Sequence, residues 1–278
     1  MKGLQLIRDQ ALSLGLMTLL YLTLVWSIQS AAWTDGLHVL TWVALLALGI
    51  GFLLGLSRWP AFLAHSYSLV AGFILLMLIF SAQLPATLTW AERSMNIILR
   101  MQRWVNVLVN KQANYDNLVF VIQLALYLWL FAYLSAWGLF RHRNVGWALI
   151  PCGVGLLFNL YYAPPELALY FLQYLAIGLV LAMRLHFQRQ RVAWAAARIG
   201  YTSDVGFDFF RDGLLIAALA VALAWALPAA PNINRLTRIG DRFESSWRNV
   251  QDEWNRMFGS LRSYYQRQGE LFNRTMLL

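Results

Sequence analysis

The chain has 278 residues, of which 60% are hydrophobic and only 13% are charged, and its formal net charge is +9 at pH 7. A soluble domain carries roughly a quarter charged residues, so this composition excludes a water-soluble globular protein and indicates a multi-pass protein in contact with the lipid bilayer. The basic residues flank apolar runs instead of clustering on a soluble face. They therefore argue for a role in membrane orientation and against nucleic acid as a partner.

The sequence predicts an all-α polytopic membrane bundle of seven transmembrane helices. Each apolar run is close to the roughly 20 residues that a helix needs to cross a bilayer, and barrel strands would alternate every second residue instead. The runs lie at residues 11–33, 39–57, 61–82, 117–140, 145–162, 166–186 and 209–228. We expect residues 1–228 to form the transmembrane domain and residues 229–278 to form an extracytoplasmic amphipathic tail. The long first run favours an uncleaved helix over a signal peptide.

The second run contains the stretch "GIGFLLG", which ends at Gly55. Its spacing is wrong for a dinucleotide-binding fingerprint, and no strand precedes it. Gly51 and Gly55 instead form a G-x-x-x-G face, which predicts close packing against another helix.

Residues 86–112, between the third and fourth runs, predict an outer amphipathic helix. Its apolar residues fall on one stripe and its polar residues on the opposite face, with the period of a helix. The apolar stripe comprises Ile97, Ile98, Met101, Trp104, Val105 and Leu108, and the polar face comprises Arg93, Asn96, Arg100 and Arg103. We expect this helix to lie flat on the lipid or on the bundle, as interfacial helices do.

The stretch "NLYYAPPELALY" between the fifth and sixth runs predicts a stiff outer hairpin. Its tyrosines fit the aromatic belt at the membrane surface, and its prolines end one helix and begin the next. The carboxylate then lies beside the positive end of the following helix. The hairpin residues are Tyr161, Tyr162, Pro164, Pro165 and Glu166.

The first connections expected inside hold Lys2, Arg8, Arg58, Arg141 and Arg143, whereas the short outer turns around Asp35 and Glu166 hold no Lys or Arg. This bias places the N-terminus in the cytoplasm and, after seven spans, the C-terminus outside. A basic cytoplasmic loop at residues 187–208 fits contact with anionic lipid headgroups, with a partner-docking loop as the alternative. The arginines expected to contact lipid are Arg184, Arg189, Arg191 and Arg198. Trp104, together with Trp247 and Trp254 in the tail, predicts a surface for a partner or for the membrane.

The sequence offers little catalytic chemistry. Cys152 lies in an apolar span where a thiolate is disfavoured, no histidine is placed to meet it, and no metal-ligand spacing occurs. We therefore expect no catalytic residue, no metal site and no cofactor, with haem or chlorophyll ligation by His65 or His186 as a minor alternative. Asn159 and Gln173 are the candidate intramembrane polar residues, and they would matter most in a transporter of small molecules or lipids.

Several strings, in this order and spacing, resemble one bacterial family. They are "VWSIQSAAW", "DNLVF", "NLYYAPP", "ARIGYTSDVGFDFFRDG", "LAWALP" and "SSWRNVQDEWNRMF". Together they resemble the polytopic N-terminal membrane domain of bacterial transglutaminase-like proteins (the TgpA type), over nearly the whole chain.

The resemblance implies a place in the bacterial cytoplasmic (inner) membrane. In that family the membrane domain precedes an extracytoplasmic transglutaminase-like domain with a Cys-His-Asp triad, and no triad position can be carried over to this chain. We therefore expect a non-enzymatic module that anchors or positions an extracytoplasmic transglutaminase-like partner, or an accessory subunit of a larger membrane complex. The alternative is a transporter-like membrane protein.

Overall fold

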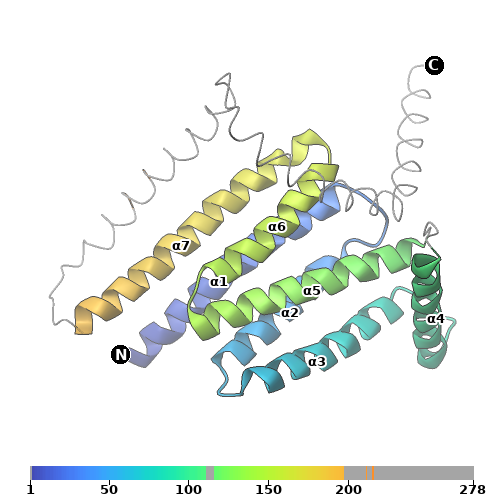
Figure 1. The fold of residues 1–278 in the computed structure, drawn as a ribbon, viewed down its shortest axis with the longest axis horizontal. Helices are drawn as coiled ribbons and strands as arrows, with labels where there is room; N and C mark the ends of the chain where they lie inside the picture. The colour runs from blue at the N-terminus through green and yellow to red at the C-terminus, as the bar shows by residue number, and fades with distance from the viewer. Residues whose placement is uncertain (1, 111–115, 197–210, 212–214, 216–278) are drawn as a thin grey trace. The chain divides into compact units, whose positions relative to one another are not determined.

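The computed structural model describes residues 2–110, 116–196, 211 and 215, and these residues are helical with short connections and no strand among them (Figure 1). In this part of the chain the elements are α1 (Lys2–Ser30), α2 (Val39–Leu56), α3 (Ala61–Ser81), α4 (Trp90–Val109), α5 (Asn117–His142), α6 (Gly146–Tyr162), a short 3-10 helix η1 (Pro165–Ala168) and α7 (Leu169–Ala196). The expected all-α class is therefore confirmed for the described residues.

Five stretches within these helices are long and apolar enough to cross a membrane. They are Asp9–Ser30, Val39–Leu56, Ala61–Ser81, Asn117–His142 and Glu166–Arg191. The expected crossing at residues 145–162 corresponds to α6, an apolar helix of only 17 residues. The expected crossing at 209–228 and the tail at 229–278 lie outside the described residues, apart from Arg211 and Leu215. A multi-pass membrane protein is thus supported by five candidate spans in this part of the chain.

The expected loop at residues 187–208 begins as helix, because α7 continues to Ala196. Residues 187–196 contain neither proline nor glycine, so nothing in the sequence ends the helix where its charges begin. The charged residues Arg189 and Arg191 therefore indicate where the apolar run ends, but the helix itself continues past them to Ala196.

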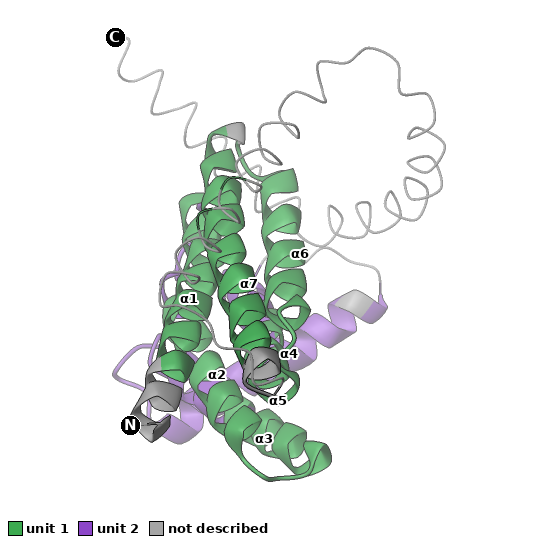
Figure 2. Ribbon diagram, turned by 90° about the vertical axis from the view of Figure 1, so that its left-hand side faces the viewer, with its two compact units in different colours: residues 1–31, 40–72, 127–229 green, residues 32–39, 73–126, 230–278 purple. Residues whose placement is uncertain are grey.

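The chain divides into two compact units (Figure 2). Unit 1 comprises residues 1–31, 40–72 and 127–229, and unit 2 comprises residues 32–39, 73–126 and 230–278.

In unit 1, α1, α6 and α7 lie side by side (Figure 1). Helix α7 runs antiparallel to α1, because Arg184 in the second half of α7 bonds to Asp9 near the start of α1, while Tyr170 at the start of α7 bonds to Ser30 at the end of α1. Helix α6 runs parallel to α1. The Cys152 thiol lies 3.5 Å from the Leu20 carbonyl oxygen, and Asn159 bonds to Ser27, which is seven residues further along both helices.

Glycines let α2 and α3 approach α5 closely in unit 1. A Cβ atom added at Gly51 would lie 2.6 Å from the carbonyl oxygen of Tyr133, and one added at Gly55 would lie 3.1 Å from the Cβ of Phe140. The two contacts advance together along α2 and α5, so these helices run parallel. The G-x-x-x-G face therefore lies on α5, where small residues allow the backbones to come close. On α3, Gly72 leaves room for the indole of Trp129 in the same way.

Unit 2 contains α4 with the last residues of α3 and the first residues of α5. Helix α4 crosses the ends of these two helices at a steep angle (Figure 1). It begins with a capping box, in which the Thr89 backbone N–H donates to the Glu92 carboxylate at 2.8 Å and the Glu92 N–H donates back to the Thr89 hydroxyl at 3.4 Å. This box satisfies two backbone groups at the start of the helix and sets where α4 begins.

Candidate functional site

The polar side chains inside unit 1 join helices to one another. Asn159 of α6 is buried, and its Nδ2 donates to the Ser27 hydroxyl of α1 at 2.8 Å. The hydroxyls of Tyr21 on α1 and Ser135 on α5 lie 2.6 Å apart in the core. Such bonds replace the water that these groups lose on burial, and they fix the depth at which neighbouring helices meet.

Asn159 and Gln173, the two intramembrane polar residues singled out from the sequence, have different environments. Asn159 is buried against Ser27, whereas Gln173 is exposed on α7. Two residues after Pro151, Gly153 leaves room for the Tyr174 hydroxyl, which donates to the Leu149 carbonyl oxygen at 2.8 Å. The polar bond that joins α6 to α7 is therefore made by Tyr174, which the sequence did not single out.

Cys152 is fully buried in α6 and makes no disulfide. His65 lies on α3, where its Nδ1 is 2.8 Å from the Tyr133 hydroxyl and its ring lies 4.6 Å from that of Trp137. Within the part of the chain that the structure describes, no three His, Cys, Asp or Glu side chains are grouped to hold a metal ion.

Three of the arginines expected to contact lipid are described, and each has a partner within the protein. Arg184 forms an ion pair with Asp9 at 3.0 Å and also reaches the Asp9 carbonyl oxygen. Arg189 donates to the carbonyl oxygen of Arg143, directly after α5, and the guanidinium of Arg191 lies 6.0 Å from the Phe187 ring. Arg198 lies outside the described residues. Contact of these arginines with anionic lipid stays a prediction.

A further arginine, Arg141, was expected from the sequence only as a basic residue of an inner connection. It donates to the carbonyl oxygens of Ser57 at 2.6 Å and Trp59 at 3.2 Å, in the connection between α2 and α3. The last carbonyls of a helix have no partner within it, and a cation there also complements the helix dipole. The position of Arg141 at the end of an apolar run indicated that it lies near a helix end. Only the folded structure shows that it bonds to the carbonyl oxygens of Ser57 and Trp59.

The outer hairpin begins where α6 ends, at Tyr162. Ala163 is extended, with φ −85° and ψ 163°, and Pro164 is also extended, with ψ 146°. Pro165 then occupies the first turn of η1, where its missing N–H costs nothing. The rings of Tyr161 and Tyr162 lie 5.0 Å apart, with Tyr161 exposed and Tyr162 buried, and Glu166 is exposed in the first turn of η1. These residues form a short bend between two helices.

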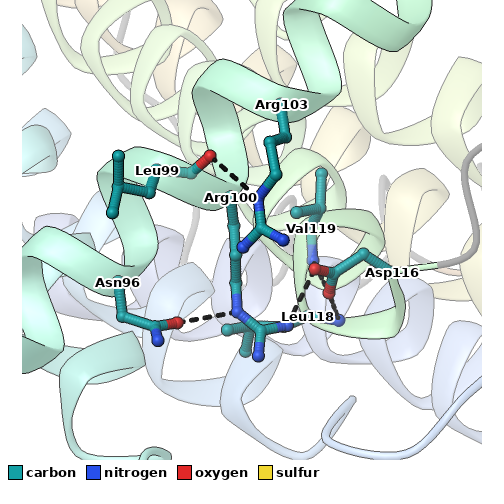
Figure 3. Close-up of polar contacts among 7 residues, drawn as sticks. All are labelled: Asn96, Leu99, Arg100, Arg103, Asp116, Leu118 and Val119. Carbon is teal, nitrogen blue, oxygen red and sulfur yellow. Dashed lines mark hydrogen bonds and ion pairs between the residues drawn. The ribbon is translucent and has the colours of Figure 1, made fainter.

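The junction of α4 with α5 joins several polar groups among the described residues of unit 2 (Figure 3). The Asp116 carboxylate accepts from the backbone N–H of Leu118 at 3.1 Å, which caps α5, and forms an ion pair with Arg100 at 2.7 Å. Arg100 also donates to the side-chain oxygen of Asn96 at 2.7 Å. An aspartate directly before an apolar run is a recognisable cap signal, but its ion pair with α4 was not predictable from spacing.

Of the three tryptophans expected to contact a partner or the membrane, the structure describes one. Trp104 is half-buried on α4, while Trp247 and Trp254 lie outside the described residues. Among the described residues, α3 carries strongly exposed apolar side chains, and its Phe62 and Leu69 keep 77% and 73% of their surface exposed. In a membrane-spanning helix such a surface faces lipid or another protein.

Comparison with known protein families, curated proteins and solved structures finds no match. The resemblance to transglutaminase-like membrane proteins therefore stays a hypothesis drawn from the sequence.

Proposed function

We propose that this chain is a non-catalytic multi-pass module of the bacterial cytoplasmic membrane that anchors and positions an extracytoplasmic transglutaminase-like partner. Acting as an accessory subunit of a larger membrane complex is a second form of the same role. The observation that favours a scaffold is the use of buried polar groups: Asn159 bonds to Ser27, and Tyr21 bonds to Ser135, so both pairs join helices. Groups committed to helix contacts fix a structure that can hold a partner in one position.

The proposed orientation places the arginine-bearing end of unit 1 in the cytoplasm. Arg141 lies in the last turn of α5 and Arg184 bonds to Asp9 near the start of α1, whereas the opposite end of the unit carries Ser30 and Tyr170. This distribution supports the positive-inside orientation. We include α6 as a further crossing and residues 209–228 as the last one, which brings the tail to the extracytoplasmic side.

Native purification tests the anchoring role. The chain, tagged at its N-terminus, would be extracted from its source membrane with the surrounding lipid, crosslinked and analysed by mass spectrometry. We expect a stoichiometric extracytoplasmic partner with a transglutaminase-like domain. Stoichiometric membrane subunits without that domain would support the accessory-subunit form, and a chain that purifies alone after crosslinking would contradict both forms.

Transport, the alternative from the sequence, predicts a different result. A substrate would raise the melting temperature of the purified chain, and Asn159→Leu would abolish this shift. A scaffold predicts that Asn159→Leu lowers the melting temperature itself, because the Ser27 hydroxyl loses its donor. The structure favours the second outcome, since Asn159 is buried between helices.

A further inference from the structure

Helix α4 presents three different faces around its circumference. One face packs against the protein and includes Ile97, which is only 3% exposed, with Met101 and Trp104 half-buried beside it. A second face carries the half-buried guanidinium groups of Arg93 and Arg100. The third is apolar and exposed. The sequence predicted a single apolar stripe, and the structure divides that stripe between the first and third faces.

The arginine face ties α4 to the ends of two candidate membrane spans. Arg93 donates to the Ser81 carbonyl oxygen at 3.5 Å, at the end of α3, and to the Leu88 carbonyl oxygen at 3.0 Å. Arg100 holds Asp116 at 2.7 Å, at the start of α5 (Figure 3). Both α3 and α5 are long and apolar enough to cross a membrane. In a bilayer that both helices cross, their ends would lie at the level of the lipid headgroups, and α4 would lie there with them.

The exposed apolar face covers about 120° of the helix at 3.6 residues per turn. Its apolar members, each with between 45% and 73% of its surface exposed, are Met95, Ile98, Leu99, Val105 and Val109. Gln102 and Asn106 lie on the same face and are uncharged. The exposed charges of α4, Glu92 and Arg103, lie outside this face, beyond Leu99. This separation of charge from apolar surface is the pattern of a helix at a lipid–water boundary.

We propose that this apolar face of α4 is a docking surface for the phospholipid bilayer itself, with its side chains in the acyl-chain boundary. The two arginine contacts set the rotation of α4 that presents this face. Continuity with the ends of α3 and α5 selects the bilayer as the occupant, because a surface held at headgroup level beside two spans meets lipid first. The surface is separate from the anchoring role and requires no protein partner.

Spin labels on single cysteines test this surface in reconstituted vesicles of neutral and anionic phospholipids. The native Cys152 is fully buried and would be replaced by alanine. Labels would be placed at Ile98→Cys and Val105→Cys on the apolar face and, as the matched control, at Arg103→Cys outside it. Collisions with oxygen, which concentrates in the bilayer, would be compared with collisions with a water-soluble nickel chelate.

We expect labels at 98 and 105 to favour oxygen and the label at 103 to favour nickel. Equal nickel access at all three positions would place the face in water and overturn the proposal. Exclusion of both reagents at 98 and 105 would mean that protein covers the face, either a second copy or another segment of this chain, and would overturn it too. Because the vesicles contain no partner, this result is independent of the anchoring role.

The rotation of α4 is tested by Asp116→Asn and Asp116→Ala in the Ile98→Cys background. Asparagine keeps a good N-cap for α5 but removes the ion pair with Arg100, whereas alanine removes both. We expect the oxygen preference at 98 to fall in both variants and to stay unchanged in Arg103→Ala, since within the described part of the chain Arg103 bonds only to the Leu99 carbonyl oxygen of its own helix. An unchanged preference in Asp116→Asn would overturn the role assigned to the ion pair.

Discussion

Asn159 shows what a single polar side chain contributes inside the bundle. Its bond to Ser27 links α6 to α1 at 2.8 Å, and both partners are buried. An interhelical hydrogen bond in a membrane protein is worth about 1 kcal/mol, and the cavity left by Asn159→Ala adds to that loss. We expect a destabilisation of about 1–2 kcal/mol, measured by reversible unfolding in mixed micelles.

Gln173→Ala is the matched control for Asn159→Ala, because Gln173 is a polar residue on an exposed surface of α7. It should change the unfolding free energy by less than about 0.5 kcal/mol. A double-mutant cycle with Ser27→Ala isolates the bond itself. A coupling energy near zero between Ser27 and Asn159 would show that the contact carries no stability.

Gly51 and Gly49 form a matched pair on α2. A Cβ at Gly51 would lie 2.6 Å from the Tyr133 carbonyl oxygen and 2.7 Å from the Ala136 Cβ, while a Cβ at Gly49 has no neighbour within 4 Å. We therefore expect Gly51→Ala to cost about 1–3 kcal/mol through overpacking. Gly49→Ala should be neutral or slightly stabilising, because alanine favours the helix. Equal melting temperatures for the two variants would contradict the close approach of α2 and α5.

At the scale of the element, the capping box of α4 carries a pH dependence. The Glu92 carboxylate accepts hydrogen bonds from the backbone N–H and the hydroxyl of Thr89, and these bonds lower the pKa of Glu92 below the ordinary value of 4.5. A lowered pKa in the folded state means that the box stabilises α4 fully above 4.5 and loses this contribution as the pH falls through the folded value. Hydrogen exchange at the first turn of α4 should be slower in the wild type than in Glu92→Gln at pH 6.

The difference in exchange between the wild type and Glu92→Gln should vanish at strongly acidic pH, when the wild-type carboxyl is also protonated. Comparing the two proteins at each pH removes the intrinsic pH dependence of exchange. A difference that persists after full protonation would assign the effect to something other than the carboxylate. A difference absent at both pH values would show that the box does not hold the first turn.

The sequence predicts helices well where a long apolar run decides the structure. Residues 39–57 were expected as a span and form α2 from Val39 to Leu56, because lipid leaves a backbone of that composition few alternatives. The rotation of α4 was less predictable, since Ile97 and Ile98 share the apolar stripe, yet only Ile97 is buried. Arg100 of the same helix pairs with Asp116, sixteen positions further along the chain, and no local periodicity contains a contact of that kind.

At the scale of the whole molecule, the contacts within unit 1 give the direction of each helix, and these directions show which helix ends share a side. Gln29 near the end of α1 bonds to Thr41 near the start of α2 at 3.1 Å, so these helices run antiparallel. Helix α2 runs parallel to α5 along the Gly51 contact, and α7 runs antiparallel to α1 through Arg184. The start of α1 and the ends of α2, α5 and α7 therefore share one side of unit 1. Arg141 and Arg184 both lie on that side, so the fold brings these two basic residues to one end of unit 1.

The length of α6 raises the question of whether it crosses the membrane. Its 17 residues span roughly 25 Å, and the hydrocarbon core is about 30 Å thick. The contacts with α1 give its depth: Leu20 pairs with Cys152 and Ser27 pairs with Asn159, each across 132 positions of sequence. At this constant offset Tyr162 is level with Ser30, where the span in α1 ends. Gly146, where α6 begins, is level with Leu14, five residues after the start of that span at Asp9. Helix α6 therefore covers nearly the depth of α1, and we expect it to cross.

Cysteine labelling of intact cells tests this crossing and the orientation together. In the Cys152→Ala background, Arg58→Cys lies between α2 and α3, Asn144→Cys lies just before α6, and Glu166→Cys lies just after it. A membrane-impermeant maleimide should label position 166 in intact cells, and positions 58 and 144 only after permeabilisation. Labelling of 144 and 166 from the same side would mean that α6 does not cross. Labelling of 58 and 144 in intact cells, with 166 protected, would keep the crossing but invert the molecule, against the distribution of its arginines.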